Sequence, residues 1–233
     1  MPPNCANEET SRMVILFDLE GTLVQSIEND QKAILEFRIK TKEKLMELGI
    51  PPSKLEDIRS STLMRNKALD YVEEHFSERD AKRFHLEMDR FQKSYELRFA
   101  DRSKIFQDTL PALRKLKTLG YNMGLVTNTS REAANRILLR RGIETFFEVV
   151  VTREDMKRLK PDPGGIILAL KRLNAQDFVF VGDLVHDSRA AENAAGVSII
   201  VKRPPSKKLT FQANYFVRSL QEIPDLILHF IGK

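Results

Sequence analysis

Five short runs of β-forming apolar residues recur along this chain, and they restrict its fold more than any other feature of the sequence. The runs cover 14–18, 122–128, 147–152, 178–183 and 197–201. Segments with apolar residues at helical spacing alternate with most of them, at 109–121, 130–142, 162–173 and 187–196. Strands that alternate with helices predict an α/β fold, in which a parallel sheet carries helices on both faces. The nearly continuous Val, Ile, Leu and Phe of the runs agree, because parallel strands are buried on both sides.

Residues that begin and end helices flank two of these segments. Ser130 is a candidate N-cap, and Gly142 is a stop signal for the helix expected at 130–142. Pro163 stands where the first turn of the next helix tolerates a proline. The boundaries therefore support separate helices between the strands.

The pattern changes from about residue 26 to about residue 104, where no strand pattern occurs. This stretch is rich in Glu, Lys, Arg, Leu and Met, with apolar residues at helical spacing. We therefore expect an all-helical insert at 26–104, placed after the first strand of a core formed by 12–25 and 105–233. The polar residues 1–11 carry no apolar segment, and we expect them to be disordered.

Composition and charge narrow the class of protein. Of the 233 residues, 42% are hydrophobic and 30% are charged, which suits a packed core. No apolar run approaches the about 18 residues that a membrane span needs. The net charge is +5, but no basic stripe with interleaved aromatic residues appears, so nucleic acid is not the expected partner. Cys5 is the only cysteine, which excludes an internal disulfide and suits a reducing, cytoplasmic location.

Polar side chains follow the predicted strands at the edge where an open parallel sheet binds ligands. They are Asp18 and Glu20, Thr127 and Asn128, Lys160, and Asp183 and Asp187. Carboxylates gathered at one edge repel one another and need a cation, and oxygen ligands without His or Cys suit Mg²⁺. A metal beside Lys160 would make a pocket for a dianion. Thr127 and the Asn128 backbone N–H would add donors near the start of a helix, so a phosphate group is the expected guest.

Four segments together resemble the signature motifs of the haloacid dehalogenase superfamily, in order and in spacing. They are "DLEGTLV" at 18–24, "VTN" at 126–128, "KPDP" at 160–163 and "VGDLVHD" at 181–187. The helical insert after the first motif resembles the mobile cap of the phosphoglycolate-phosphatase-like branch. The resemblance implies a Rossmann-like three-layer parallel sheet core with the cap above the active site. It also implies Mg²⁺-dependent phosphate transfer from a small phosphorylated metabolite.

The resemblance also implies which residues hold the metal. Asp18 would bind Mg²⁺ through one carboxylate oxygen, and Glu20 through its backbone carbonyl. Asp183 would be a direct ligand. Asp187 would act from behind the ligands or through a water molecule, and it could also hold Lys160.

Catalytic roles follow from the same resemblance. Asp18 would be the nucleophile that forms an aspartyl-phosphate. Lys160 would screen the charge between nucleophile and phosphate and stabilise the transition state. Thr127 and Asn128 would grip the phosphoryl group being transferred. Glu20 would protonate the leaving oxygen and then activate water.

Glu20 departs from the family pattern, in which the second acid of the first motif is usually an aspartate. A glutamate reaches about one ångström further, and an error of that size costs on the order of a hundredfold in rate. Enolase-phosphatases of the same superfamily also carry a glutamate there, whereas the dehalogenase branch has no carboxylate. An acid at this position therefore favours phosphate chemistry and a catalytic Glu20 over a surface acid.

Three functions fit the motifs. The main hypothesis is a phosphatase, a phosphate-monoester hydrolase that acts as a monomer or homodimer. The alternatives are a sugar-phosphate mutase on the same scaffold and a non-catalytic phosphate-binding scaffold. Arg59 and Arg65 lie where related caps present substrate-recognising side chains, although a solvated helix face is an equal alternative for them.

Overall fold

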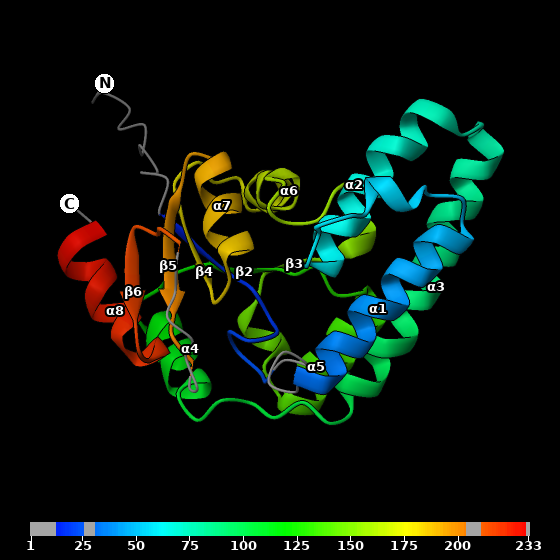
Figure 1. Ribbon diagram of the computed structural model, residues 1–233. Coiled ribbons are helices and arrows are strands. Elements are labelled where there is room, and N and C mark those ends of the chain that lie inside the picture. Colours follow the sequence, from blue (N-terminus) through cyan, green and yellow to red (C-terminus); the bar gives the residue numbers. More distant parts are fainter. Residues whose placement is uncertain (1–12, 26–30, 204–210, 232–233) are drawn as a thin grey trace, which may run out of the picture.

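The computed structural model describes residues 13–25, 31–203 and 211–231. In this part of the chain, six parallel strands form one sheet in the order β3-β2-β1-β4-β5-β6. The strands are β1 Val14–Phe17, β2 Met123–Val126, β3 Val149–Val151, β4 Phe178–Gly182, β5 Val197–Val201 and β6 Tyr215–Val217. Because β1 lies between β2 and β4, the segments that follow these three strands meet at the centre of the sheet edge (Figure 1).

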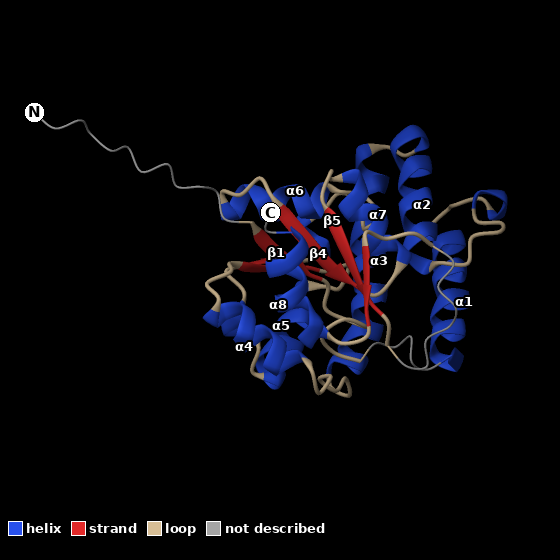
Figure 2. Ribbon diagram, turned by 90° about the vertical axis from the view of Figure 1, so that its left-hand side faces the viewer, coloured by secondary structure: helices blue, strands red, loops and turns tan. Residues whose placement is uncertain are grey.

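Helices cover both faces of the sheet, as the sequence predicts for an α/β fold. They are α4 Thr109–Thr118, α5 Arg131–Arg141, α6 Gly164–Leu173, α7 Val185–Asn193 and α8 Ile223–Leu226. Ile15 and Phe17 face one way and pack with α4, α5 and α8, while Val14 and Leu16 face the other way and pack with α6 and α7. Figure 2 shows these two helical layers on either side of the strands.

The predicted boundaries of the core helices are close to those observed. Helix α5 begins after Ser130 and ends at Gly142, which adopts the left-handed conformation with φ 63°. The Ser130 hydroxyl makes no capping bond, and the Ser130 backbone N–H donates instead to Glu96 at 3.0 Å. Helix α6 begins directly after Pro163.

The described residues between 31 and 104 form helices and turns and no strand. The helices are α1 Gln31–Glu47, α2 Ser61–His75 and α3 Glu78–Ala100. We call these three helices the helical unit. Apolar side chains of the unit form a hydrophobic core of their own, which includes Leu45, Met64, Leu69, Phe84 and Met88. In Figure 1 the unit stands beside the sheet on the side of β3.

Helix α3 belongs to two hydrophobic cores at once. Phe84 and Met88 are buried in the core of the helical unit. Leu97 and Ala100, near the other end of α3, pack into the core beneath the sheet. One continuous helix therefore fastens the helical unit to the rest of the molecule.

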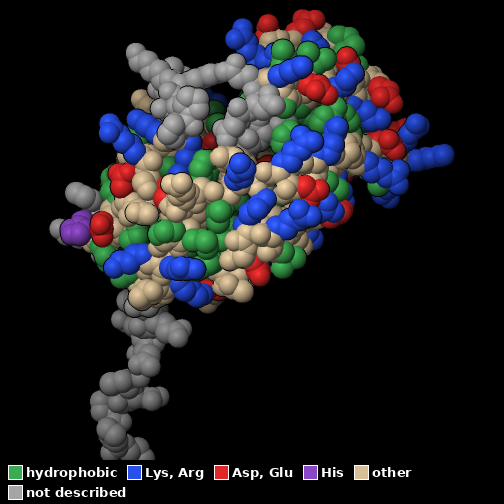
Figure 3. Space-filling model, turned by 90° about the horizontal axis from the view of Figure 1, so that it is seen from below, with side chains coloured by type: hydrophobic (Ala, Val, Ile, Leu, Met, Phe, Trp, Pro, Cys, Tyr) green, Lys and Arg blue, Asp and Glu red, His purple; other side chains and the backbone are tan. Residues whose placement is uncertain are grey.

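Shorter turns complete the described structure. They are 3-10 helices at Pro52–Lys54, Glu144–Phe146, Arg153–Asp155 and Leu220–Glu222, and a π-helix at Ile227–Ile231. None of the helices in the described ranges is both long enough and apolar enough to cross a membrane. Lys and Arg side chains are scattered among acidic and apolar ones on the face shown in Figure 3. Residues 1–11, expected to be disordered, lie outside the described ranges.

Candidate active site

Lys160 joins two acids that are far apart in the sequence. Its ammonium donates to Asp18 Oδ1 at 2.6 Å and to Asp187 Oδ1 at 2.7 Å. A third hydrogen bond, of 3.0 Å, goes to the carbonyl oxygen of Val126 at the end of β2. The Lys160 side chain is only 3% exposed, so water contributes little to its solvation. These three bonds use all three ammonium hydrogens and fix Lys160 at the end of β1, as the strand-end argument predicted.

Burial makes the charges of this group costly. It raises the pKa of Asp18 to about 6, with Lys160 opposing the rise and the Asp187 carboxylate adding to it. Burial also disfavours the charged form of Lys160, but Asp18 and Asp187 outweigh that effect and raise the Lys160 pKa. The ammonium therefore stays protonated. Burial makes the ionised form of Asp18, the nucleophile predicted from the sequence, less favourable.

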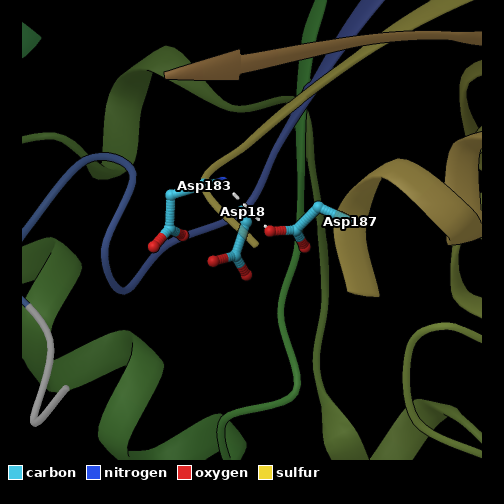
Figure 4. A group of neighbouring side chains, drawn as sticks. All are labelled: Asp18, Asp183 and Asp187. Carbon is cyan, nitrogen blue, oxygen red and sulfur yellow. Dashed lines mark hydrogen bonds between the residues drawn. The ribbon is translucent and has the colours of Figure 1, made fainter. Parts of the chain in front are cut away.

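Asp183 completes a group of three carboxylates. One oxygen each from Asp18, Asp183 and Asp187 lies within 4.8 Å of the others, and Figure 4 shows Asp18 between the other two. Asp187 Oδ2 accepts the backbone N–H groups of Asp183 and Leu184, at 3.1 and 3.0 Å. Since Asp187 Oδ1 accepts from Lys160, both oxygens of Asp187 already hold protein groups. Asp18 and Asp183 are therefore better placed as direct metal ligands, with Asp187 behind them.

Two glycines make room for this group. Gly21 has φ 85°, and a Cβ there would lie 2.3 Å from Asp183 Oδ2. A Cβ on Gly182 would lie 2.3 Å from the Asp187 Cβ. Any larger residue at either position would push an acid out of place.

The end of β2 supplies Thr127 and Asn128, as predicted. The Asn128 side chain accepts the Lys160 backbone N–H at 2.9 Å, and its amide donates to the Lys160 carbonyl at 3.4 Å. Asn128 thus holds the loop that carries Lys160. The Thr127 hydroxyl is buried and accepts the Thr129 N–H at 3.3 Å, which leaves its own hydrogen to donate elsewhere. Within the described ranges, the Asn128 backbone N–H donates to no acceptor.

Glu20 is held by a residue that the sequence argument did not single out. Thr129 Oγ1 donates to Glu20 Oε2 at 2.8 Å, and Thr129 is 4% exposed. Thr129 stands two residues after Thr127 in the same loop. The run "VTNTS" at 126–130 could have pointed to Thr129 from the sequence, because every side chain of that loop starts near the sheet edge.

These residues open onto a cavity of about 320 Å³. Asp18, Glu20, Thr127 and Lys160 line it from the core. From the helical unit and the two residues that precede α2 it is lined by Ile34, Phe37, Arg38, Arg59, Ser60, Ser61, Thr62, Gln92, Tyr95, Glu96 and Phe99. The site therefore faces both parts of the molecule.

The two arginines that the resemblance singled out have different surroundings in the structure. Arg59 lines the cavity. Arg65 does not, because it is 3% exposed and pairs with Asp89 of α3 at 3.2 Å. Arg38 of α1, which the sequence argument did not mention, also lines the cavity.

Polar contacts fasten the helical unit to the loops of the site. The Asn66 side chain donates to the Leu159 carbonyl at 2.8 Å and accepts the Leu159 N–H at 3.0 Å. Arg153, which follows β3 and is 1% exposed, pairs with Asp89 and Glu96 of α3. Contacts of this kind place the unit directly beside Lys160.

The fold and the polar residues at the strand ends are those of an α/β enzyme. Comparison with known proteins identifies the family. The family model of haloacid dehalogenase-like hydrolases matches residues 13–195. The chain belongs to this family, as its motifs predicted, and it is a hydrolase.

Relatives and solved structures agree with that assignment. The chain is 30% identical over 223 residues to a pyrophosphatase PpaX of Listeria monocytogenes, an alignment that covers 90% of this chain and 93% of that one. It is 28% identical over 197 residues to a phosphoglycolate phosphatase of Pseudomonas putida, covering 80% and 68%. A phosphatase of the same superfamily from Thermococcus onnurineus has a similar fold, with a TM-score of 0.59 and 24% identity over 92% of this chain and 97% of that one.

Proposed function

We propose that this chain is a Mg²⁺-dependent phosphatase that hydrolyses a small phosphorylated metabolite through an aspartyl-phosphate on Asp18. The observation that carries the proposal is the position of the Lys160 ammonium, 2.6 Å from Asp18 Oδ1 and 2.7 Å from Asp187 Oδ1. A lysine between two acids neutralises charge around a nucleophile that must approach an anionic substrate.

The residues present suit a magnesium ion. Asp18, Asp183 and Asp187 offer only carboxylate oxygens, and no His or Cys belongs to the group. With Lys160 protonated, the three carboxylates leave two negative charges without a counter-charge, which is the charge of one Mg²⁺. Asp18, Asp183 and the Glu20 backbone carbonyl would hold the ion, with Asp187 fixing the loop behind. When bound, the ion would supply positive charge that lowers the pKa of Asp18 and neutralises the phosphoryl oxygens.

Asp18 carries out the first step. One of its carboxylate oxygens attacks phosphorus, and the bond from phosphorus to the leaving oxygen breaks. Glu20 gives its proton to that oxygen, so the leaving group departs as a neutral alcohol. The Thr127 hydroxyl and the Asn128 backbone N–H donate to the phosphoryl oxygens. Lys160 holds Asp18 in line for attack.

Glu20 acts again in the second step, now as a base. It takes a proton from a water molecule, whose oxygen attacks phosphorus. The bond between phosphorus and Asp18 breaks, which releases inorganic phosphate and restores the carboxylate. The hydrogen bond from Thr129 keeps Glu20 over this site in both steps.

The contact of the helical unit with the site supports a role as a cap. We propose that 26–104 forms the cap domain and that 12–25 with 105–233 forms the catalytic core. The unit lines the cavity together with the core, so it excludes bulk water from Asp18 while the substrate is bound.

One assay tests this function. The purified protein is incubated with Mg²⁺ and p-nitrophenyl phosphate, beside Asp18→Asn and Asp225→Asn. Asp225 is an exposed residue of α8, away from the site, and serves as the matched control. We expect wild type and Asp225→Asn to release phosphate, and Asp18→Asn to lose at least about a thousandfold in rate. Chelation of the metal should abolish turnover, and Mg²⁺ should restore it.

Two results would contradict the proposal. Equal turnover by Asp18→Asn and wild type would remove Asp18 from the chemistry. Conversion of a sugar phosphate to its isomer, without net release of inorganic phosphate, would identify a mutase instead.

A further inference from the structure

The residues that line the site cavity indicate which leaving groups fit the site. Much of the wall is apolar, formed by Ile34 and Phe37 of α1, Tyr95 and Phe99 of α3, and Leu159 of the core. Its volume of about 320 Å³ lies at the lower end of the range for pockets that enclose an organic ligand. A water molecule takes about 30 Å³ in the liquid. A phosphoryl group with a two-carbon leaving group has about the volume of five water molecules and would fill only about half of this space.

Aromatic rings make up a fixed part of that wall. The Phe37 and Tyr95 rings are 5.1 Å apart, and both line the cavity. Phe91 stacks on Phe37 from behind, with ring centroids 6.1 Å apart and planes 6° apart. Rings held by neighbours in this way present a rigid apolar surface. A flat or apolar group binds favourably against it because its own apolar surface is removed from water.

Gln92 adds one unsatisfied polar group to the same cavity. It is 4% exposed, and its Oε1 has no hydrogen-bond partner in the described part of the chain. On the same helix, Asp89 and Glu96 are paired with Arg153, whereas no partner of Gln92 Oε1 is found among the described residues. Buried amide groups are normally hydrogen-bonded, so this one calls for a ligand that supplies the missing bond.

Inorganic phosphate and glycolate match these walls poorly as leaving groups. Pyrophosphate would place a second, strongly hydrated phosphate against Phe37, Tyr95 and Phe99, and moving such a charge out of water onto an apolar wall is costly. Phosphoglycolate offers no apolar body to fill the space. Arg38 and Arg59 also line the cavity and attract anions, so a comparison of pyrophosphate and phosphoglycolate with uncharged leaving groups sets that attraction against burial on the apolar wall.

We propose that the substrate is a phosphate monoester of an organic alcohol with a ring-sized apolar body and a hydroxyl or similar substituent that hydrogen-bonds to Gln92. The inference rests on the proposed phosphatase function and names its substrate class. The phosphoryl group lies at Asp18. The apolar body lies against Phe37 and Tyr95, and the substituent reaches the amide of Gln92. After cleavage the leaving group departs as the free alcohol, with the proton from Glu20.

The test compares leaving groups that differ in size, charge and polarity. With Mg²⁺ present, kcat/KM is measured for pyrophosphate, phosphoglycolate, ethyl phosphate, benzyl phosphate and the three hydroxybenzyl phosphates. The ortho and para hydroxybenzyl esters lose phosphate spontaneously by elimination, so every rate is taken above that of a sample without enzyme. We expect benzyl phosphate to exceed ethyl phosphate and phosphoglycolate by at least about tenfold, because the ring is buried. At least one hydroxybenzyl isomer should exceed benzyl phosphate by a further fivefold or so, because Gln92 gains a partner.

A substitution tests whether the preference for a hydroxybenzyl ester over benzyl phosphate depends on Gln92. Gln92→Leu keeps the size of the side chain and removes the amide. We expect the ratio of kcat/KM for the preferred hydroxybenzyl isomer over benzyl phosphate to fall to about one. Gln176→Leu, at an exposed position before β4, is the matched control and should keep the wild-type ratio. Thermal unfolding of both variants checks that they are folded.

The outcomes separate this inference from the function on which it rests. If Asp18→Asn is inactive but pyrophosphate or phosphoglycolate surpasses every ring-bearing ester, the phosphatase stands and the substrate class is wrong. An unchanged ratio in Gln92→Leu would likewise overturn the assignment of Gln92. If wild type hydrolyses none of the esters, p-nitrophenyl phosphate included, the proposed function itself fails.

Discussion

The Thr129 hydroxyl donates a hydrogen bond of 2.8 Å to Glu20 Oε2, across the edge of the sheet between the ends of β1 and β2. Glu20 is the position at which this chain departs from the usual aspartate of its family. The longer side chain needs a partner to fix its carboxyl group, because each added rotatable bond widens the range of positions it can take. Thr129 provides that partner from a neighbouring strand end.

Removing the Thr129 hydroxyl should impair acid catalysis. We expect Thr129→Val to lower kcat/KM about tenfold on an alkyl phosphate, whose leaving oxygen must be protonated. The loss should be smaller on p-nitrophenyl phosphate, whose leaving group departs without a proton. Thr129→Ser keeps the hydroxyl and should restore most of the rate. An equal loss on both substrates would mean that Thr129 supports the fold rather than Glu20.

Restoring the family's usual aspartate should not help this enzyme. Glu20→Asp shortens the side chain and gives up the contact with Thr129. We expect kcat on an alkyl phosphate to fall about tenfold or more, because the carboxyl group no longer reaches the leaving oxygen. Steady-state kinetics beside Glu56→Asp, an exposed control, measure the effect. A faster Glu20→Asp enzyme would contradict the role given to Thr129.

Loss of the Lys160 ammonium should change both rate and pH dependence. Lys160→Met leaves Asp18 and Asp187 buried without their shared cation, so the pKa of Asp18, already raised to about 6, should rise further. We expect kcat to fall about a hundredfold to a thousandfold, with the acid limb of the pH profile displaced to higher pH.

Kinetics of Lys160→Met across pH, beside Lys171→Met on the exposed face of α6, check this expectation. An unchanged acid limb would show that Lys160 does not set the charge of Asp18.

The contact between Asn66 and Leu159 should matter for turnover. Asn66 bonds both backbone groups of the residue that precedes Lys160, at 2.8 and 3.0 Å. We expect Asn66→Ala to lower kcat/KM about tenfold, because the loop loses two hydrogen bonds that fix it. Asn122→Ala, at an exposed position before β2, should behave as wild type. Wild-type kinetics for Asn66→Ala would show that Asn128 alone holds this loop.

Asp155 should make stability depend on pH. Burial disfavours its charge, but hydrogen bonds from Thr152, Arg172 and Arg131 outweigh burial and hold the Asp155 pKa at about 2. A pKa below the unfolded value of about 4 stabilises the folded protein above pH 4, and that contribution disappears as the pH falls towards 2.

We therefore expect Asp155→Asn to lower Tm by a few degrees at pH 7. The difference from wild type should shrink between about pH 4 and pH 2, and calorimetry of both proteins across that range measures it. A difference that stays constant with pH would mean that shape rather than charge matters at Asp155.

Much of the site was predictable from strand ends alone. In a parallel sheet, consecutive strands point the same way, so a polar residue directly after each one must reach the same edge. This reasoning correctly brought Asp18, Asp183, Asp187 and Lys160 together. It required that the apolar runs be recognised as strands and, for Lys160, that the loop after β3, which ends at Val151, return to the same edge. Their catalytic roles remain predictions.

Other features depend on how separate elements pack, and local patterns did not contain them. Asn66 lies on a helix surface and meets Leu159 only because the helical unit docks at that loop. Arg65 is a candidate substrate-binding residue by its place in the sequence, but in the structure it pairs with Asp89. Strand β6, of three residues at the sheet edge, is too short to show a period in the sequence.

The continuous helix α3 determines how the helical unit can move. A helix rises about 1.5 Å per residue, so this one is a rod about 34 Å long. One end is clamped beneath the sheet at Leu97 and Ala100, and Glu96 pins it to Arg153. Asp89, about two turns closer to the other end, also pairs with Arg153, so the helix is held from Asp89 to Ala100. The turns from Glu78 to Met88 extend about 16 Å beyond this held part, so a movement of the helical unit relative to the sheet would have to bend α3 near Asp89 or break its pairs with Arg153.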